Sequence, residues 1–265
     1  MKRTLENVWS PQRRNRRDVD VYVPGSYRTG GNRRYPVVYM QDGQNLSDPA
    51  TAFAGTWDLE AALERLAARG LEIIVVGAHH AGEERLEEYS PFPDRRLGGG
   101  EGESYLAFLV DTLKPRIDRL FRTRTNCDET AIFGSSMGAL ISLYAFFRHP
   151  SVFGRAGVMS PSVWFGQGAI LDYIAAAKAP GGRVYLDVGM REGAGTLKHA
   201  RQLARLLVRK GFRRDTRTER AASPTAERRA RRAASLLRYV EDPGGGHQEA
   251  AWAHRLEGAF DFLLD

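Results

Sequence analysis

Residues 130–147, TAIFGSSMGALISLYAFF, change their hydrophobic period at a single serine. Thr130–Phe133 is a short apolar run typical of a buried strand, and beyond Gly138 the apolar side chains recur at helical spacing. The pentapeptide between them fits G-x-S-x-G, in which glycines let a strand and a helix pack closely around a strained turn. The pattern predicts a nucleophile elbow with Ser136 at its tip.

The rest of the chain alternates between apolar runs and amphipathic stretches. We expect further strands at 19–23, 35–40, 71–77, 156–159, 183–188 and 236–241, and further helices at 57–68, 105–120, 170–177, 197–208 and 249–264. Within the helical stretch 105–120, Pro115 marks a kink or a break. This alternation predicts an α/β fold with a mostly parallel sheet and helices on both faces. Because little chain separates 156–159 from 170–177, we expect no large cap domain over the cleft.

Length and charge bound the domain organisation. A chain of 265 residues with 42% hydrophobic content favours one domain with one sizeable core. Of the net charge of +7, residues 1–18 carry +4 and residues 213–232 carry +5, which leaves −2 for the remainder. We therefore expect a basic N-terminal arm at 1–18 and a domain at 19–265 with an arginine-rich surface insertion at about 213–235. This charge distribution does not favour nucleic acid as a partner. A patch of arginines in the insertion that binds anions remains an alternative.

Several features exclude other classes of protein. No apolar run reaches the roughly 18 residues of a membrane span, and the first residues lack the apolar core of a signal peptide, so we expect a cytoplasmic protein without membrane contact. Cys127 is the only cysteine, which excludes an intrachain disulfide. His79 and His80 are adjacent and have no companion carboxylate motif, so we expect them at most to line a pocket. The sequence predicts no metal and no cofactor, and it leaves the oligomeric state open.

Two loops that follow predicted strands supply partners for Ser136. In a parallel α/β sheet the ligand crevice lies beyond the carboxyl ends of the strands. Glu192 follows the predicted strand 183–188, and His247 follows a triple glycine after the predicted strand 236–241. The order serine, acid, histidine is that of α/β-hydrolases. We expect His247 to be the general base and favour Glu192 as the acid.

Two other carboxylates compete with Glu192 for the role of the acid. Asp187 lies inside a predicted strand, and Asp242 lies only five residues before His247 in the sequence. Both positions suit a catalytic acid less well than Glu192 does, and both alternatives remain open at this stage.

Further motifs occur in a fixed order along the chain. They are YMQDGQNL at 39–46, FAGTW at 53–57, RLEEYSP at 85–91, GSSMG at 134–138, SPSVW at 160–164, LDVG at 186–189 with Glu192, and GGH at 245–247 with Trp252. Together they resemble the putative esterase family of α/β-hydrolases, which includes enterochelin-esterase-like proteins, feruloyl and acetylxylan esterases, S-formylglutathione hydrolases and mycolyltransferases. The resemblance extends from about residue 19 to 262 and excludes only the arginine-rich insertion.

The resemblance implies a role for each matching residue. It makes Ser136 the nucleophile, His247 the base and Glu192 the acid, and it places the oxyanion hole at the backbone N–H groups of Gln44 and Met137. The chain departs from the family where Gln41 replaces a usual histidine and Ala139 replaces a common glycine. We expect both departures to adjust the pocket without removing the chemistry.

These patterns predict a serine carboxylesterase that forms an acyl-enzyme intermediate from a small-molecule or acylated-carbohydrate ester. Trp57, Tyr89 and Trp164 are candidates for the walls of the substrate cleft, although packing in the core would also explain these aromatic side chains. Two alternatives remain. One is acyl transfer to an alcohol or sugar, and the other is a catalytically silent hydrolase fold that binds a polyanion through its arginines.

Overall fold

The computed structural model describes residues 1–52, 55–215 and 235–264. The strands are β1 (Lys2–Ser10), β2 (Asn15–Tyr22), β3 (Val37–Met40), β4 (Ile74–Ala78), β5 (Thr130–Ser135), β6 (Arg155–Met159), β7 (Arg183–Gly189), β8 (Arg213–Arg214) and β9 (Leu236–Asp242). The α-helices are α1 (Leu59–Ala68), α2 (Arg85–Glu88), α3 (Gly102–Ala107), α4 (Lys114–Leu120), α5 (Ser136–Arg148), α6 (Ala169–Ala176), α7 (Ala194–Arg209) and α9 (Glu249–Leu264). In this part of the chain, none of the helices combines the length and the apolar character that crossing a membrane requires.

The described strands form one sheet in the order β1-β2-β4-β3-β5-β6-β7-β9-β8. All neighbours from β4 to β8 pair in parallel, whereas β1 pairs with β2, and β2 with β4, in antiparallel fashion. Parallel strands need crossover connections, which the helices supply. The mostly parallel sheet predicted from the sequence is confirmed.

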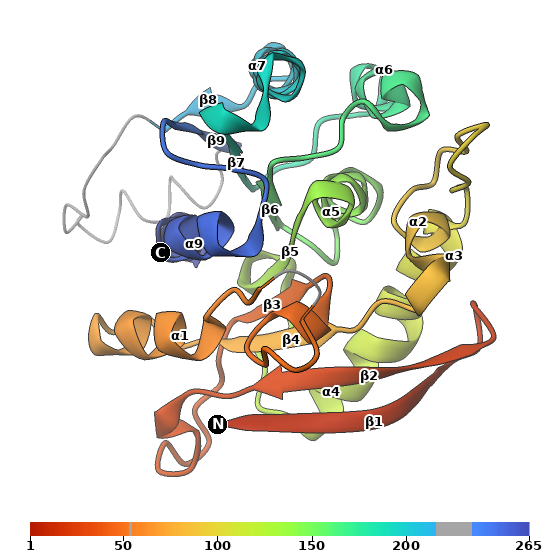
Figure 1. Ribbon diagram of the computed structural model, residues 1–265. Helices are drawn as coiled ribbons and strands as arrows, with labels where there is room; N and C mark the ends of the chain where they lie inside the picture. The colour runs from red at the N-terminus through yellow and green to blue at the C-terminus, as the bar shows by residue number, and fades with distance from the viewer. Residues whose placement is uncertain (53–54, 216–234, 265) are drawn as a thin grey trace.

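Helices cover both faces of the sheet (Figure 1). In β3, Val37 and Tyr39 point to the face covered by α3 to α7, while Val38 and Met40 point to the face covered by α1 and α9. This alternation of apolar residues on both faces is what a buried parallel strand requires. Between β6 and α6 the chain has only a short 3₁₀ helix, Phe165–Gly168, so this connection does not form a cap.

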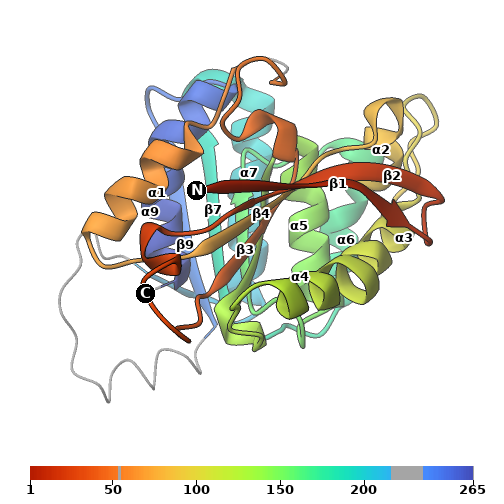
Figure 2. The ribbon, with the colours of Figure 1, turned by 90° about the horizontal axis from the view of Figure 1, so that it is seen from below.

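The basic N-terminus is part of the sheet and not a separate arm. Residues 1–18, predicted as an arm, form β1 and the first half of β2, a hairpin along the edge of the sheet (Figure 2). The prediction was wrong because the charge of Arg17 is buried in the fold. Its side chain is 0% exposed and donates to the equally buried carboxylate of Glu88 at 2.5 and 2.8 Å.

The buried carboxylate of Glu88 fixes α2 against the hairpin. Arg13 and Asn15 also donate to it, at 3.2 and 3.0 Å. Burial opposes ionisation, but the hydrogen bonds and charge of Arg17 outweigh it and lower the pKa of Glu88. The long connection between β4 and α3 therefore contains an ordered helix, α2.

Two other expectations are resolved by the structure. The helical stretch changes its hydrogen-bond pattern before Pro115: a π-helix at Phe108–Leu113 leads directly into α4, and Pro115 is the second residue of α4. At the predicted insertion 213–235, Arg213 and Arg214 form β8, which pairs with β9. Residues 216–234 of this insertion lie outside the described residues.

We predict that Arg17→Met lowers the free energy of unfolding by about 3 kcal/mol, because it leaves the buried Glu88 carboxylate without its main counter-charge. Urea unfolding at neutral pH measures this loss. The double variant Arg17→Met/Glu88→Leu is expected to recover most of it, because neither charge is then buried. Arg14→Met, at an exposed position of the same hairpin, is the control. If Arg17→Met lowers the free energy of unfolding no more than Arg14→Met does, the conclusion that the buried Arg17–Glu88 pair stabilises the fold is contradicted.

Candidate active site

The sharp turn at Ser136 arises from close backbone packing. Ser136 is the first residue of α5, directly after β5, and has a φ of +54°, in the left-handed region. A Cβ atom on Gly134 would lie 2.6 Å from the carbonyl of Gly138, and one on Gly138 would lie 2.9 Å from the Cβ of Gln41. Only glycine fits at these two positions, so strand and helix meet without a spacer and the serine side chain stands at the edge of the sheet.

Three side chains from different parts of the chain form a continuous hydrogen-bonded series. Ser136 Oγ lies 3.0 Å from His247 Nε2, and His247 Nδ1 lies 2.8 Å from Glu192 Oε2. Glu192 follows β7 and His247 follows β9, so both come from the carboxyl edge of the sheet. The His247 side chain is 43% exposed, whereas that of Glu192 is fully buried. The geometry is that of a nucleophile, a base and an orienting acid.

The second carboxylate oxygen of Glu192 is also hydrogen-bonded. Oε1 accepts from the backbone N–H of Gly189 at 2.7 Å and from the hydroxyl of Ser160 at 2.5 Å. Burial opposes ionisation, but the hydrogen bonds from His247, Ser160 and Gly189 outweigh it and lower the pKa of Glu192. Glu192 is therefore an ionised carboxylate at neutral pH.

Arg255 engages both of the alternative acids. Its Nε donates to Asp187 at 2.8 Å, and its Nη1 donates to Asp242 at 2.9 Å. Asp187 is completely buried, and this burial raises its pKa to about 6 in spite of Arg255. Neither carboxylate takes the position on His247 that Glu192 occupies.

The glycines before His247 allow two loops to touch. A Cβ atom on Gly245 would lie 2.4 Å from Arg255 Nη1 and 3.0 Å from the Cα of Gly189. The backbone N–H of Arg191 also donates to the carbonyl of Gly245, at 3.0 Å. This contact joins the loop that carries Glu192 to the loop that carries His247, so the glycine supplies close approach as well as flexibility.

The two residues expected to form the oxyanion hole lie at the carboxyl edge of the sheet, in the segments that follow β5 and β3. Met137 is the second residue of α5, where a backbone N–H has no acceptor within the helix. Gln44 lies in the short 3₁₀ helix Gly43–Asn45 that follows β3. This segment is fixed at Asp42, whose N–H donates to the Tyr89 hydroxyl at 3.0 Å and whose carboxylate accepts from Arg85 at 2.7 and 2.8 Å.

The three aromatic residues expected to line the cleft have different surroundings. Trp164 is 48% exposed, but Trp57 and Tyr89 are only 2% and 0% exposed. Trp57 stacks on Trp252 at 5.7 Å between ring centroids, and Tyr89 supports Asp42 through its hydroxyl. The expectation of a cleft wall was therefore wrong for Trp57 and Tyr89, which pack behind the surface, and it remains for Trp164.

Ser162 and Trp252 are among the residues that contact the site without a role predicted from the sequence. Ser162 Oγ lies 3.1 Å from Ser136 Oγ, and the Ser162 N–H donates to the carbonyl of Ser136 at 3.1 Å. The indole of Trp252 meets the His247 ring edge-on, with 5.0 Å between centroids. Ser162 lies in the motif SPSVW, and Trp252 accompanies the motif GGH. These motifs indicated that both residues belong near the site, but a motif does not predict which atoms are in contact.

Gln41 and the two adjacent histidines have structural partners. Gln41, which replaces the family's usual histidine, accepts from the Tyr105 hydroxyl at 2.5 Å in the buried interior. His79 pairs with Asp20 at 3.0 Å, and the backbone N–H of His80 donates to the side chain of Gln44 at 3.3 Å. Within the described ranges, no three histidine, cysteine, aspartate or glutamate side chains gather closely enough to bind a metal ion.

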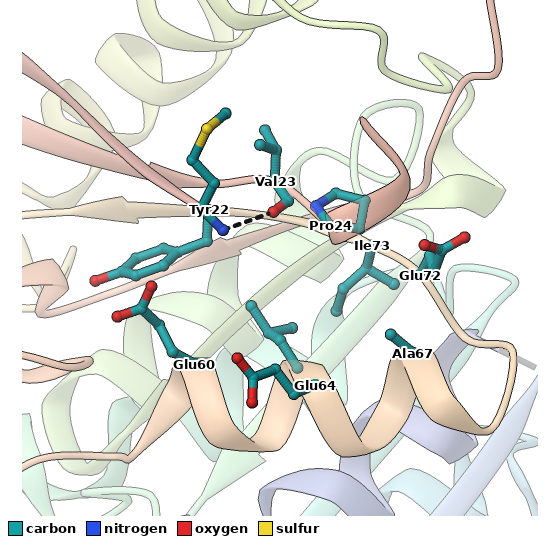
Figure 3. Close-up of a pocket in the computed structure, with 11 residues that line it drawn as sticks. Tyr22, Val23, Pro24, Glu60, Glu64, Ala67, Glu72 and Ile73 are labelled. Atoms are coloured by element: carbon teal, nitrogen blue, oxygen red, sulfur yellow. Dashed lines mark hydrogen bonds between the residues drawn. The ribbon is translucent and has the colours of Figure 1, made fainter. Parts of the chain in front are cut away.

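A separate pocket lies at the other end of the sheet. It has a volume of about 250 Å³, and Tyr22, Glu60, Glu64 and Ile73 are among its lining residues (Figure 3). Ile73 precedes the amino end of β4, whereas Ser136 follows the carboxyl end of β5, which lies in the same parallel array. This pocket therefore does not belong to the site around Ser136.

A mostly parallel sheet with serine, acid and histidine in this order, after β5, β7 and β9, defines the class of α/β-hydrolases. The chain belongs to the family described as "Putative esterase", whose model matches residues 10–263. The resemblance found in the sequence is thus confirmed, and the protein is a carboxylic-ester hydrolase.

Individual relatives agree with this membership. "Uncharacterized protein YbbA" of Bacillus subtilis (strain 168) is 30% identical over 224 residues, which cover 80% of this chain and 86% of that protein. The siderophore enterobactin esterase of Emericella nidulans is 34% identical over 82 residues, which cover 31% of this chain and 26% of that protein. The crystal structure of the BES protein from Bacillus cereus is similar in fold, with a TM-score of 0.74 at 19% sequence identity. The match covers 100% of this chain and 95% of that protein.

The lowered pKa of Glu192 predicts a pH-dependent contribution to stability. Ionised Glu192 stabilises the folded protein above the ordinary value of 4.5, and this contribution is lost as the pH falls through the lower pKa of the native state. Glu192→Gln is expected to reduce the free energy of unfolding by about 1–3 kcal/mol at pH 7. Urea unfolding between about pH 3 and pH 7, roughly the range over which carboxylates titrate, should show this difference shrinking at the acid end. Glu83→Gln, at an exposed position, is the control, and a pH-independent difference would contradict the prediction.

Proposed function

We propose that this protein is a serine carboxylesterase that uses Ser136, His247 and Glu192 through an acyl-enzyme intermediate. The observation that carries the proposal is the unbroken series of contacts from Ser136 Oγ to His247 Nε2 at 3.0 Å and from His247 Nδ1 to Glu192 at 2.8 Å. A serine hydroxyl is a weak nucleophile unless an adjacent base removes its proton, and the base must itself be oriented.

Each atom of this series has one role in acylation. Nε2 of His247 accepts the proton of Ser136 as Oγ attacks the ester carbonyl. The Glu192 carboxylate accepts a hydrogen bond from Nδ1–H, which keeps the lone pair of Nε2 directed at the serine. The imidazolium that forms is stabilised by the negative charge of Glu192, and it then donates its proton to the departing alcohol.

The negative charge on the carbonyl oxygen requires hydrogen-bond donors. The backbone N–H groups of Gln44 and Met137 supply them in this proposal, and each such donor contributes about 3 kcal/mol to lowering the barrier. The anchoring of Asp42 by Tyr89 and Arg85 supports this role, because it fixes the backbone two residues before Gln44. Water then attacks the acyl-enzyme with His247 again as the base.

The substrate proposed is a small-molecule or acylated-carbohydrate ester that enters an open cleft. Exposed Trp164 is the proposed wall, since it lies two residues beyond Ser162, which contacts the nucleophile. The relative from Emericella nidulans is named as a siderophore enterobactin esterase, so a siderophore ester belongs in the first substrate panel beside feruloyl and acetyl-sugar esters.

We predict that Ser136→Ala reduces kcat for p-nitrophenyl acetate by at least about 10³-fold, because loss of a triad nucleophile removes the covalent route. A fluorophosphonate probe should add its mass to the wild-type protein at Ser136 and leave the variant unmodified, as measured by peptide mass spectrometry. Ser26→Ala, distant from the elbow, is the control. Wild-type turnover no faster than that of Ser136→Ala would end the proposal.

A second prediction concerns the cleft wall. Trp164→Ala is expected to raise KM about 5- to 10-fold with kcat within about 2-fold, because it removes apolar contact area from substrate and transition state alike. Steady-state kinetics with an aromatic ester measures both constants. Trp9→Ala is the matched control, since Trp9 is 44% exposed but lies on the edge hairpin. Equal KM values for the two variants would remove Trp164 from the site.

A further inference from the structure

A second serine, Ser160, lies behind the acid. It directly follows β6 and has a φ of +47°, in the left-handed region, and its backbone N–H donates to the carbonyl of Asp187 at 3.0 Å. The residue is 0% exposed. Its hydroxyl meets three groups, namely Glu192 Oε1 at 2.5 Å, Trp252 Nε1 at 3.0 Å and Arg255 Nη2 at 3.4 Å.

The chemistry of these neighbours fixes the direction of the Ser160 proton. An indole N–H and a guanidinium N–H can donate a hydrogen bond but cannot accept one. The oxygen of Ser160 therefore accepts from Trp252 and Arg255, and its single O–H proton is left for Glu192. A serine hydroxyl can normally rotate among partners, but here two donor-only groups remove that choice.

We propose that Ser160 is a positioning residue that fixes the ionised form of Glu192 and thereby the tautomer of His247, an inference that rests on the proposed function. With donors from Ser160 and Gly189 on Oε1, the proton on His247 Nδ1 is directed to Oε2. His247 Nε2 is then left as the acceptor that faces Ser136.

Trp252 couples the orientation of the acid to that of the base. Its Nε1 donates to Ser160, while the same indole meets His247 edge-on at an interplanar angle of 81°. Its other neighbour is the buried Trp57, stacked at an interplanar angle of 27°. Trp252 lies in α9, so this helix supports both members of the pair through one side chain.

Two substitutions at position 160 test the proposal. Ser160→Ala removes the hydroxyl but keeps a Cβ atom at a position with a positive φ. Ser160→Gly also removes the hydroxyl, and glycine adopts this φ without strain. Each is expected to lower kcat for p-nitrophenyl acetate by about 10- to 100-fold, the effect of losing one hydrogen bond to a charged group. KM is expected to change less than about 2-fold, because Ser160 does not touch the substrate.

Thr123→Val is the matched control. Thr123 is 0% exposed and its hydroxyl donates to the carboxylate of Asp118 at 2.7 Å, so the variant also deletes a buried hydroxyl-to-carboxylate hydrogen bond. Thr123 pairs with Tyr35, before β3 begins, and so lies at the end of the sheet away from Ser136. Its kcat is expected to equal that of the wild type.

Trp252→Phe tests the donor argument by removing the N–H while keeping an aromatic ring. One of the two donors that orient the Ser160 hydroxyl is then lost, so kcat is expected to fall about 3- to 10-fold, less than for loss of the hydroxyl itself. This variant and Ser160→Gly decide the question if Ser160→Ala does not fold.

A spectroscopic readout separates positioning from a merely structural role and from the proposed function. The Nδ1–H proton of His247 should give a low-field NMR resonance in the free wild-type protein, assigned by its loss in His247→Gln. We expect it to move upfield or broaden in both Ser160 variants and to remain in Thr123→Val. Since no substrate is present, this result stands even if ester hydrolysis fails. Wild-type kcat, or an unchanged resonance, in the Ser160 variants would overturn the proposal.

Discussion

The tight junction between β5 and α5 is the constraint on which the site depends. Strand and helix meet without a spacer only because Gly134 and Gly138 present no side chain to one another or to Gln41. The junction forces Ser136 into a left-handed conformation, and the surrounding packing must stabilise this strained residue. Its side chain then projects at the carboxyl edge of the sheet, the same edge at which the loops after β7 and β9 leave. Parallel pairing from β5 to β9 therefore brings Glu192 and His247 to the serine, although both are distant from it in the sequence.

These long-range relations explain which parts of the candidate site could be predicted from the sequence. The elbow is encoded locally by a change of period and by glycine spacing, and the parallel sheet follows from the alternation of strands and helices. Once the sheet is parallel, every strand-to-helix loop opens on one edge, so residues that follow strands could be selected as candidate partners of Ser136. The choice among carboxylates was harder. Asp187, Glu192 and Asp242 all lie near that edge, and only the coordinates show that Arg255 engages two of them.

The failures of sequence reasoning have a common cause. Arg17 and Glu88 are separated by 71 positions, so nothing near Arg17 indicates that its charge is buried against a carboxylate, and a basic stretch then resembles a solvated arm. Trp57 and Trp164 are the same residue type beside predicted site segments, yet one is 2% and the other 48% exposed. Burial is a property of the assembled layers and not of the local pattern. The hairpin also supports the candidate site. Arg17 binds Glu88 in α2, and Arg85 of the same helix binds Asp42, two residues before Gln44.

Arg255 has a role in the electrostatics of the whole carboxyl edge. Three carboxylates gather there, and negative charges at short range raise one another's pKa, as Glu192 does for Asp187. Arg255 supplies a positive charge to Asp187 and Asp242 together, and its third contact is the hydroxyl of Ser160. Its charge therefore opposes the burial and the repulsion from Glu192 that raise the pKa of Asp187. One arginine thus engages Asp187 and Asp242, while Glu192, whose pKa is lowered by its own hydrogen bonds, is the carboxylate that contacts Nδ1 of His247.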